Sequence, residues 1–283
     1  MAKVIMVQGT ASGVGKTILA TALCRIFTQD GLKTAPFKSQ NMTNIFHTLD
    51  DGRKMARSQA IAAYACNSEP NPDMNPILLM MGSDGTEVIA GGIPMGIMSH
   101  DEYNGYKKEA FRQVRAAFDR LCESHDVIVI EGAGSPVELN MNKDDIANMG
   151  LAKAVNAPVL LVSDIMRGGV FASLYGTLAL LPEDERRLVK GIVVNKFKGS
   201  SEHFKNGISI LEDICNAPVL GVVPFTDIQL EDEDSLTDGE IKTKDSYGPF
   251  PAIQMGLEFD RIAIHFRTNL NMGMLYKILN GDT

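Results

Sequence analysis

Short, almost wholly apolar runs recur along the chain, separated by longer stretches in which apolar residues return every three or four positions. The runs are too short for helices, and they lack the apolar–polar alternation of strands that face water on one side. They therefore predict strands that are covered on both faces. Six runs fit this description: Val4–Val7, Thr34–Phe37, Val127–Ile130, Val159–Val162, Ile192–Val194 and Val219–Val223.

The stretches between the runs predict amphipathic helices. Across residues 111–121, for example, one helix face gathers the apolar residues Phe111, Val114, Ala117, Phe118 and Leu121. The predicted helices are Lys16–Asp30, Arg53–Asn67, Asp101–Ser124, Ile146–Val155, Gly169–Leu181 and Ser201–Cys215. This alternation predicts the α/β class, with a doubly wound, mostly parallel sheet flanked by helices. Ligands of such sheets bind outside the carboxyl ends of the strands.

Two segments depart from the alternation. Asn71–Ser99 is rich in Pro, Gly and Met and predicts a long excursion, of a length that is usually functional. Asp227–Pro251 is acidic and contains Gly and Pro, which predicts an exposed loop or linker. We expect Leu257–Leu279 to return as a helix onto the main domain. The predicted division is a main domain over 1–226, a linker over 227–251 and a C-terminal segment over 252–283.

Composition narrows the classes of partner. The formal net charge of −8 argues against nucleic acid, which is held by clustered Lys and Arg. Apolar runs stay well below the roughly 18 residues that span a bilayer, and the amino terminus lacks the layout of a signal peptide. The four cysteines lie far apart, without metal-ligand spacing. The sequence therefore predicts a cytoplasmic protein without nucleic-acid or membrane partners.

A glycine-rich loop follows the first predicted strand and precedes a predicted helix. Its glycines let backbone N–H groups curl around phosphate oxygens, and the helix N-terminus adds partial positive charge. Lys16 can reach the β- and γ-phosphates, and the Thr17 hydroxyl can bind Mg²⁺. Five residues, rather than the usual four, separate the first glycine from the Gly-Lys pair, which narrows the choice among P-loop NTPases. We predict that ATP and Mg²⁺ bind here, at Gly9, Thr10, Ser12, Gly13, Val14, Gly15, Lys16 and Thr17.

Charged side chains also follow the second and third predicted strands. Lys38 comes directly after Thr34–Phe37, where a second cation can stabilise a phosphoryl group in transfer. Glu131 follows Val127–Ile130, and its carboxylate can hold Mg²⁺ directly or through water. The Gly-Ala-Gly after Glu131 leaves room for a phosphate or substrate. Lys16, Lys38 and Glu131 are the predicted catalytic residues.

The later strand ends leave alternatives open. After Val159–Val162, Asp164 or Arg167 can contact a substrate or stabilise a loop. After Ile192–Val194, the amide of Asn195 can read an adenine edge or satisfy backbone groups.

With these motifs, residues 1–236 resemble the N-terminal synthetase domain of the cobyric acid synthase family, which is related to dethiobiotin synthetases. The run Arg167–Pro182 identifies this family more specifically than a P-loop does. The matching stretches are Val7–Ser12, Ala35–Met42, Asp73–Pro76, Val129–Pro136, Asn148–Ala152, Arg167–Thr177, Val194–Phe197 and Leu220–Pro224.

The resemblance implies a reaction of cobalamin biosynthesis. ATP phosphorylates peripheral carboxylates of a corrinoid ring, and ammonia converts each acyl phosphate to an amide. By the match, Asn195 and Pro224 border the adenine, and Asn41, Asn75 and Ser135 face the substrate carboxylate. The resemblance also implies a homodimer. The full predicted substrate set is Ser39, Gln40, Asn41, Asn75, Gly134, Ser135 and Arg167.

The sequence departs from the family pattern at three points. Gly13 stands where the family usually has Asp, and Met166 replaces another expected Asp. The family normally continues into a glutaminase domain with a nucleophilic Cys and a His, whereas this chain has no Cys beyond Leu236. We therefore expect ammonia to come from solution or from a separate glutaminase subunit.

Two alternative functions share the P-loop. One is a carboxylase-type ligase like dethiobiotin synthetase, in which a carbamate replaces the carboxylate. The other is an ATPase switch of the partitioning type. Such switches usually carry a second Lys early in the loop, where this chain has Thr10 and Ala11.

Overall fold

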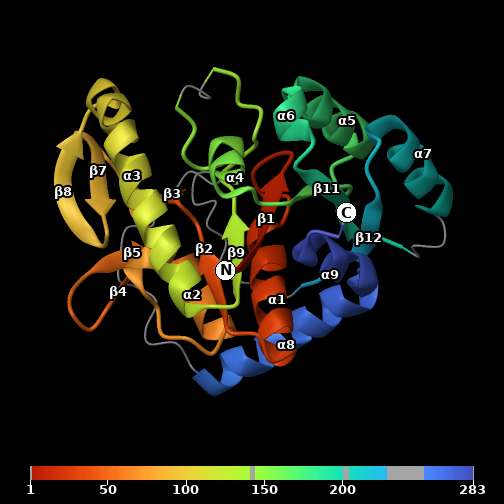
Figure 1. The fold of residues 1–283 in the computed structure, drawn as a ribbon, viewed down its shortest axis with the longest axis horizontal. Coiled ribbons are helices and arrows are strands. Elements are labelled where there is room, and N and C mark those ends of the chain that lie inside the picture. Colours follow the sequence, from red (N-terminus) through yellow and green to blue (C-terminus); the bar gives the residue numbers. More distant parts are fainter. Residues whose placement is uncertain (1, 141–143, 200–203, 228–251, 283) are drawn as a thin grey trace.

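The computed structural model describes residues 2–140, 144–199, 204–227 and 252–282, and its centre is a six-stranded parallel sheet (Figure 1). The strands are β1 (Lys3–Gly9), β2 (Thr34–Phe37), β9 (Val127–Glu131), β10 (Val159–Asp164), β11 (Val189–Phe197) and β12 (Val219–Pro224). They lie in the order β12-β11-β10-β1-β9-β2, and every neighbouring pair is parallel. All six predicted strands are confirmed.

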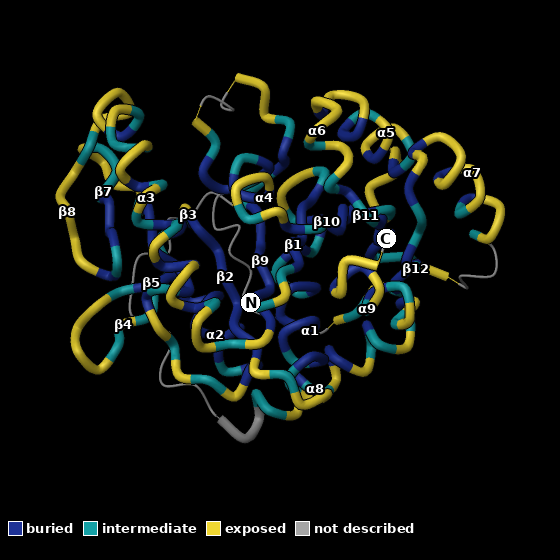
Figure 2. Tube along the Cα trace, viewed as in Figure 1, coloured by how far each residue is buried: buried dark blue, intermediate teal, exposed yellow. Residues whose placement is uncertain are grey.

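Helices cover both faces of this sheet. One face carries α1 (Lys16–Gln29), α8 (Ala252–Asn269) and α9 (Met272–Asn280), and the other carries α3 (His100–Ser124), α4 (Met149–Val155), α5 (Val170–Leu180) and α7 (Lys205–Cys215). Successive residues of β1 alternate between the two layers: Ile5 and Val7 pack with α1, and Met6 packs on the opposite side. Figure 2 shows the strands buried and the outer helix faces exposed. The doubly wound α/β architecture is confirmed.

Two of the predicted helices begin later than the sequence indicated: the one predicted over Ile146–Val155 starts at Met149, and the one predicted over Arg53–Asn67 starts later still. Within the predicted Arg53–Asn67, residues Lys54–Ala56 form strand β5, which pairs antiparallel with β4 (Phe46–Thr48). Helix α2 starts only at Arg57 and ends at Ala65. The predicted start of the helix was wrong because tertiary contacts hold residues 54–56 in an extended conformation. One of these contacts is the hydrogen bond from the Ala56 N–H to Oδ1 of Asn75 (2.9 Å). The short helix α6 (Glu183–Arg186) was not predicted.

The excursion over 71–99 forms a second, smaller sheet. After the 3₁₀ turn η1 (Pro72–Met74) come β6 (Ile77–Gly82), β7 (Gly85–Ala90) and β8 (Ile93–Met98), which pair antiparallel in sequence. β3 (Gln40–Met42) joins β6 in parallel and completes the order β3-β6-β7-β8. The turn between β7 and β8 is Gly91-Gly92, whose φ angles of +57° and +83° suit a tight hairpin. The sequence did not predict these strands.

The C-terminal residues form two helices rather than the single predicted one. Between α8 and α9, the Asn271 N–H donates to the Leu220 carbonyl of β12 (2.7 Å), which ties the break to the sheet edge. α8 packs on α1 and contributes Phe266 to the core cluster under it. Apart from Asp227, the predicted linker lies outside the described residues, and the predicted domain division stays a prediction.

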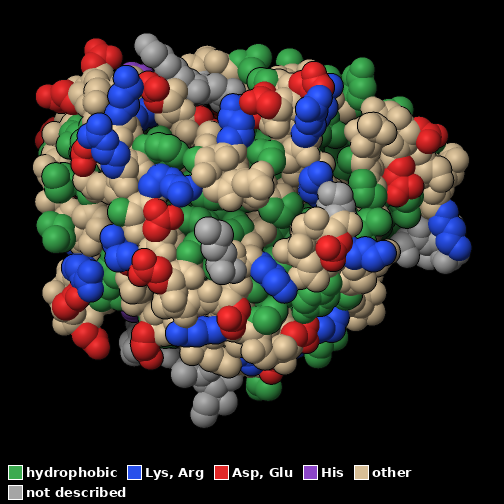
Figure 3. Space-filling model, in the orientation of Figure 1, with side chains coloured by type: hydrophobic (Ala, Val, Ile, Leu, Met, Phe, Trp, Pro, Cys, Tyr) green, Lys and Arg blue, Asp and Glu red, His purple; other side chains and the backbone are tan. Residues whose placement is uncertain are grey.

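Charges on the face seen in Figure 3 are mixed, with Lys and Arg interspersed among Asp and Glu. Of the helices that the structure describes, none has both the length and the apolar character needed to cross a membrane.

Candidate active site

The loop Gly9–Thr17 joins β1 to α1 at the carboxyl edge of the central sheet. Gly15 caps the helix in the left-handed conformation (φ +100°), and a Cβ built there would stand 2.2 Å from Nδ2 of Asn195, so only glycine fits. No side chain caps the first turn of α1. Its backbone N–H groups and the positive end of its dipole therefore face the loop, as in a phosphate-binding site.

Lys16 connects the phosphate-binding loop to the loop after β9. The residue is only 7% exposed, and its Nζ donates to the carbonyl oxygens of Ala11 (3.0 Å) and Gly134 (2.9 Å). Two of the predicted site segments, which lie far apart in the sequence, thus meet at one ammonium group. Binding of a triphosphate by Lys16 stays a prediction.

Glu131 gathers three side chains at the end of β9. Its Oε1 accepts from the Thr17 hydroxyl (2.7 Å) and from Nζ of Lys38 (3.1 Å), and its Oε2 accepts from Nε2 of Gln59 (3.4 Å). The side chains of Lys38 and Glu131 are only 6% and 2% exposed. Desolvation makes a buried ion pair a weak source of stability, so its presence indicates a functional site.

The oxygens of Thr17 and Glu131 suit a magnesium ion. Mg²⁺ prefers hard oxygen ligands and is usually held by one or two protein oxygens, with phosphates and waters completing its shell. The hydroxyl and the carboxylate lie in contact, beside the loop that would hold the phosphates. The residues present therefore fit the predicted ion.

The predicted substrate residues near β2 and β3 are buried, except for the half-buried Gln40, and most of them form hydrogen bonds. The Asn75 side chain donates to the carbonyls of Lys38 (3.0 Å) and Ile77 (3.2 Å) and accepts from Ala56, so it braces three segments. The Gln40 oxygen accepts from the hydroxyl of Tyr103, whose pKa is raised by burial. Ser39 and Asn41 are 0% and 3% exposed. A direct substrate contact by any of these residues stays a prediction.

The other predicted substrate residues lie on two separate loops. The Gly134 carbonyl accepts from Lys16, and Oγ of Ser135 accepts from the Val137 N–H (3.4 Å), so both adjoin the Glu131 site. Arg167 follows β10, two strands away from β9, and its side chain is 73% exposed. The structure does not bring Arg167 into contact with Glu131.

Asn195, which is predicted to border the adenine, forms a hydrogen bond to the phosphate-binding loop. Nδ2 of Asn195 donates to the Val14 carbonyl (2.9 Å), which is the backbone-satisfying arrangement that the sequence left open. The next residue, Lys196, has φ +60° and donates to the Gly13 carbonyl. The Pro224 carbonyl lies 3.0 Å from Nε2 of His265 on α8. Adenine contacts of Asn195 and Pro224 stay predictions.

Sequence reasoning missed two supporting residues. Asn148 holds the loop after β9: its Oδ1 accepts from the Ala133 N–H (2.8 Å), and its Nδ2 donates to the carbonyls of Ala133 (2.8 Å) and Ser135 (3.3 Å). Gln59 contacts Glu131 from α2. The available signal for Gln59 was a large polar residue directly before the apolar run Ala60–Ala63.

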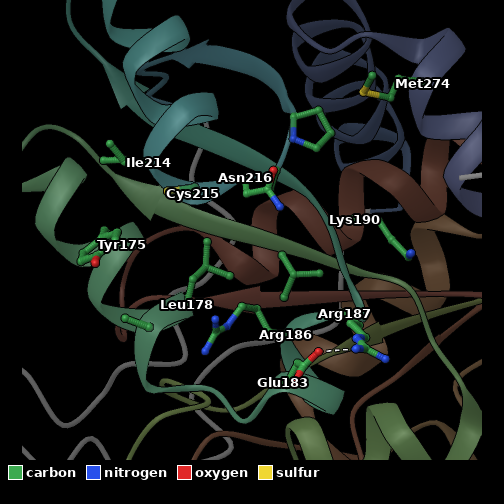
Figure 4. A pocket seen from close by; sticks show the side chains of 14 residues that line it. Tyr175, Leu178, Glu183, Arg186, Arg187, Lys190, Ile214, Cys215, Asn216 and Met274 are labelled. Carbon is green, nitrogen blue, oxygen red and sulfur yellow. Dashed lines mark hydrogen bonds and ion pairs between the residues drawn. The ribbon is translucent and has the colours of Figure 1, made fainter.

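A separate cavity of about 620 Å³ lies near the amino ends of β11 and β12 (Figure 4). None of the predicted site residues lines it. Apolar side chains such as Leu178 and Ile214 share its wall with Arg186 and Lys190. It is therefore a different region from the site around Glu131.

Comparisons with known proteins agree with this geometry. Residues 5–235 match the family model described as the CobQ/CobB/MinD/ParA nucleotide binding domain. The chain is 51% identical over 239 residues to a protein named cobyric acid synthase from Ruminiclostridium cellulolyticum, covering 84% of this chain and 46% of that protein. Its likeness to the cobyric acid synthase of Clostridium acetobutylicum is 52% over 232 residues, covering 81% and 47%. The chain thus spans about half the length of the curated relatives it matches.

Solved structures show weaker likeness. The septum site-determining protein MinD complexed with Mg-ADP, from Pyrococcus horikoshii, has a TM-score of 0.44 at 14% identity, covering 93% of this chain and 95% of that one. The signal recognition particle receptor FtsY from Elizabethkingia anophelis, in complex with GDP, has a TM-score of 0.44 at 19% identity, covering 92% and 63%.

Proposed function

Since this chain belongs to the CobQ/CobB/MinD/ParA nucleotide-binding domain family, we propose that it uses ATP and Mg²⁺ to activate a corrinoid carboxylate for amidation. The observation that carries the proposal is the meeting of Thr17 and Lys38 on the buried carboxylate of Glu131, beside the loop that contains Lys16. A phosphoryl-transfer site needs this combination of a phosphate-binding loop, a metal-binding carboxylate and a second cation.

The proposed reaction has two steps. In the first, a carboxylate oxygen of the substrate attacks the γ-phosphorus of ATP, the bond to the β-phosphate oxygen breaks, and ADP leaves an acyl phosphate behind. In the second, ammonia attacks the acyl carbon, inorganic phosphate leaves, and the nitrogen loses a proton to give the amide. Both steps move negative charge onto phosphate oxygens, which fixed cations stabilise.

Four side chains would each have a role in these steps. Lys16 would neutralise the β- and γ-phosphates, and Lys38 would face the phosphoryl group in transfer. Thr17 and Glu131 would hold Mg²⁺, which when bound polarises the phosphate oxygens. The burial of Lys38 and Glu131 supports this division, because charge interactions are stronger where water is excluded.

The partners and compartment follow as further proposals. The name shared by the curated relatives supports a corrinoid substrate, such as cobyrinic acid a,c-diamide. We propose that ammonia comes from solution or from a separate glutaminase subunit, and that the chain forms a homodimer. A cytoplasmic location is supported by the four cysteines, all present as free thiols.

A product assay tests the function. The chain is incubated with ATP, Mg²⁺ and ammonium, together with cobyrinic acid a,c-diamide or, in a second reaction, with 7,8-diaminopelargonate and bicarbonate. We expect mass spectrometry to find carboxyl groups of the corrinoid converted to amides. Product only in the second reaction would instead identify a dethiobiotin synthetase-like ligase. ATP hydrolysis without product in either reaction would contradict a synthetase and favour the switch.

A further inference from the structure

Several buried oxygens near Glu131 lack a hydrogen-bond partner. In the described part of the chain, seven buried side-chain oxygens are unpartnered. Four belong to residues that adjoin the Glu131 site in space or in sequence: Gln8, Ser39, Ser58 and Gln59. Gln8 lies against Gly132, where a Cβ would stand 2.2 Å from the Gln8 oxygen. Because buried polar atoms are nearly always paired in folded proteins, such a concentration indicates a site that receives a ligand.

Gln59 is the best defined of the four. It lies in the first turn of α2, is 2% exposed, and directs Nε2 toward Oε2 of Glu131 (3.4 Å). A carboxylate accepts hydrogen bonds and does not donate them, so the amide must turn its NH₂ group toward Glu131. The amide oxygen of Gln59 is consequently held beside Glu131 without a donor.

The missing partner must present N–H or O–H groups. Phosphate oxygens of a nucleotide accept hydrogen bonds, so they cannot donate one to Oε1 of Gln59. The Thr17 hydroxyl and one N–H of Lys38 point at the carboxylate itself, and no donor in the described part of the chain reaches Oε1 of Gln59. A hydrated magnesium ion meets the requirement, because Mg²⁺ keeps several of its waters when it binds and each of these donates hydrogen bonds.

We infer that Gln59 is a positioning residue for the metal ion. Its Nε2 orients the carboxylate of Glu131, and its Oε1 accepts a hydrogen bond from a water in the coordination shell of Mg²⁺. Residues that orient a metal ligand commonly change metal affinity by about 10- to 100-fold when replaced. The inference rests on the proposed function only in requiring a magnesium nucleotide at the phosphate-binding loop; it does not depend on the substrate.

Magnesium-dependent nucleotide binding tests this role. The Gln59→Met variant keeps the side-chain length and removes both polar atoms. We expect the Mg²⁺ concentration that half-saturates binding of a fluorescent ATP analogue to rise about 10- to 100-fold. Affinity for the analogue in EDTA should remain that of the unchanged protein. Binding of Mn²⁺ to the ADP complex, followed by electron paramagnetic resonance, should weaken in parallel.

Thr21→Val provides the matched control. Thr21 is another buried residue with an unpartnered oxygen, one helical turn beyond Thr17 on α1. Its replacement should leave the half-saturating Mg²⁺ concentration unchanged. If Gln59→Met does not fold, Gln59→Asn retains the amide but withdraws it by one methylene, and the same increase is expected.

Three results would overturn the inference. One is an unchanged half-saturating Mg²⁺ concentration in a folded Gln59 variant. Another is equal weakening of nucleotide binding with and without Mg²⁺, which would assign Gln59 to the loop as a whole. The third is a rise in the KM for ammonium alone, which would show that the amide oxygen receives ammonia. A protein that gives the expected Mg²⁺ shift but makes no amide would refute the proposed function and leave this inference standing.

Discussion

A cluster of charged side chains lies at each end of α1, and the two clusters differ in how far they are buried. At its beginning, Lys16 and Thr17 adjoin the Lys38–Glu131 pair, whose side chains are 6% and 2% exposed. At its other end, Arg25 pairs with Asp260 of α8 (2.8 Å), and these side chains are 14% and 42% exposed. Exposed pairs of this kind are screened by water and join one helix to another. The two clusters differ in burial rather than in the kinds of charge that they contain.

The largest expected effect belongs to the beginning of the helix. Lys16→Ala removes the ammonium group that would neutralise the transferred phosphates, so kcat/KM for ATP should fall by roughly 10²- to 10³-fold. Steady-state kinetics measures this change, and the melting temperature checks that the variant is folded. Full synthetase activity in Lys16→Ala would refute the assignment of the site.

The next effect concerns the buried pair. Lys38→Met keeps most of the side-chain volume but removes the charge, and we expect kcat to fall by about 10²-fold while KM for ATP changes little. The reason is that the contact of Lys38 should strengthen only in the transition state. A change confined to KM would mean that Lys38 binds the ground state. Thermal melting is again required, because Glu131 is left buried without its cation.

At the other end of α1, the expected effect is on stability alone. Arg25→Ala should lower the free energy of unfolding in urea by about 1 kcal/mol or less, since the side chain of its partner Asp260 is 42% exposed. The kcat should be unchanged. Arg112→Ala is the control for removing one charge from an exposed ion pair. Arg112 pairs with Glu109 within α3, and their side chains are 79% and 50% exposed. Loss of activity in a folded Arg25→Ala would contradict the separation of the two clusters.

The smallest expected effect is on how the free energy of unfolding depends on pH. The Arg25 guanidinium lowers the pKa of Asp260. Burial raises the pKa of Asp30, but hydrogen bonds from Arg267 and Tyr276 outweigh it, and the net pKa is lowered. A lowered pKa in the folded state stabilises the fold above the ordinary pKa of aspartate, and this stability is lost as the pH falls through the lowered value.

Urea unfolding as a function of pH measures this contribution. Below about pH 4 the free energy of unfolding should decrease, and the decrease should be shallower in Arg25→Ala than in the unchanged protein. Identical pH profiles would show that the pairing of Asp260 with Arg25 does not hold α8 on α1.

The central sheet and the meeting of Lys38 with Glu131 could be predicted for one physical reason. Parallel strands covered on both faces leave continuous apolar runs, and their carboxyl ends converge, so Lys38 and Glu131 could be placed without coordinates. The second sheet could not. β8 exposes Ile93, Met95 and Ile97, so its pattern does not resemble a buried strand, and its pairing with β7 depends on a turn. Gln59 was missed because it lies in the first turn of α2 rather than at the end of a strand of the parallel sheet, so the convergence of strand ends did not place it beside Glu131.

The position of β1 has a consequence for the order in which the protein assembles. β1 precedes every other strand of the central sheet in sequence, yet it lies in the middle of that sheet, where Lys3 pairs with Val127 and Met6 pairs with Val159. Pairings so distant in sequence form slowly, because a long stretch of chain must be ordered to close them. We therefore expect the loop at the end of β1 to acquire its shape late in folding, although it precedes the other strands of the central sheet in sequence.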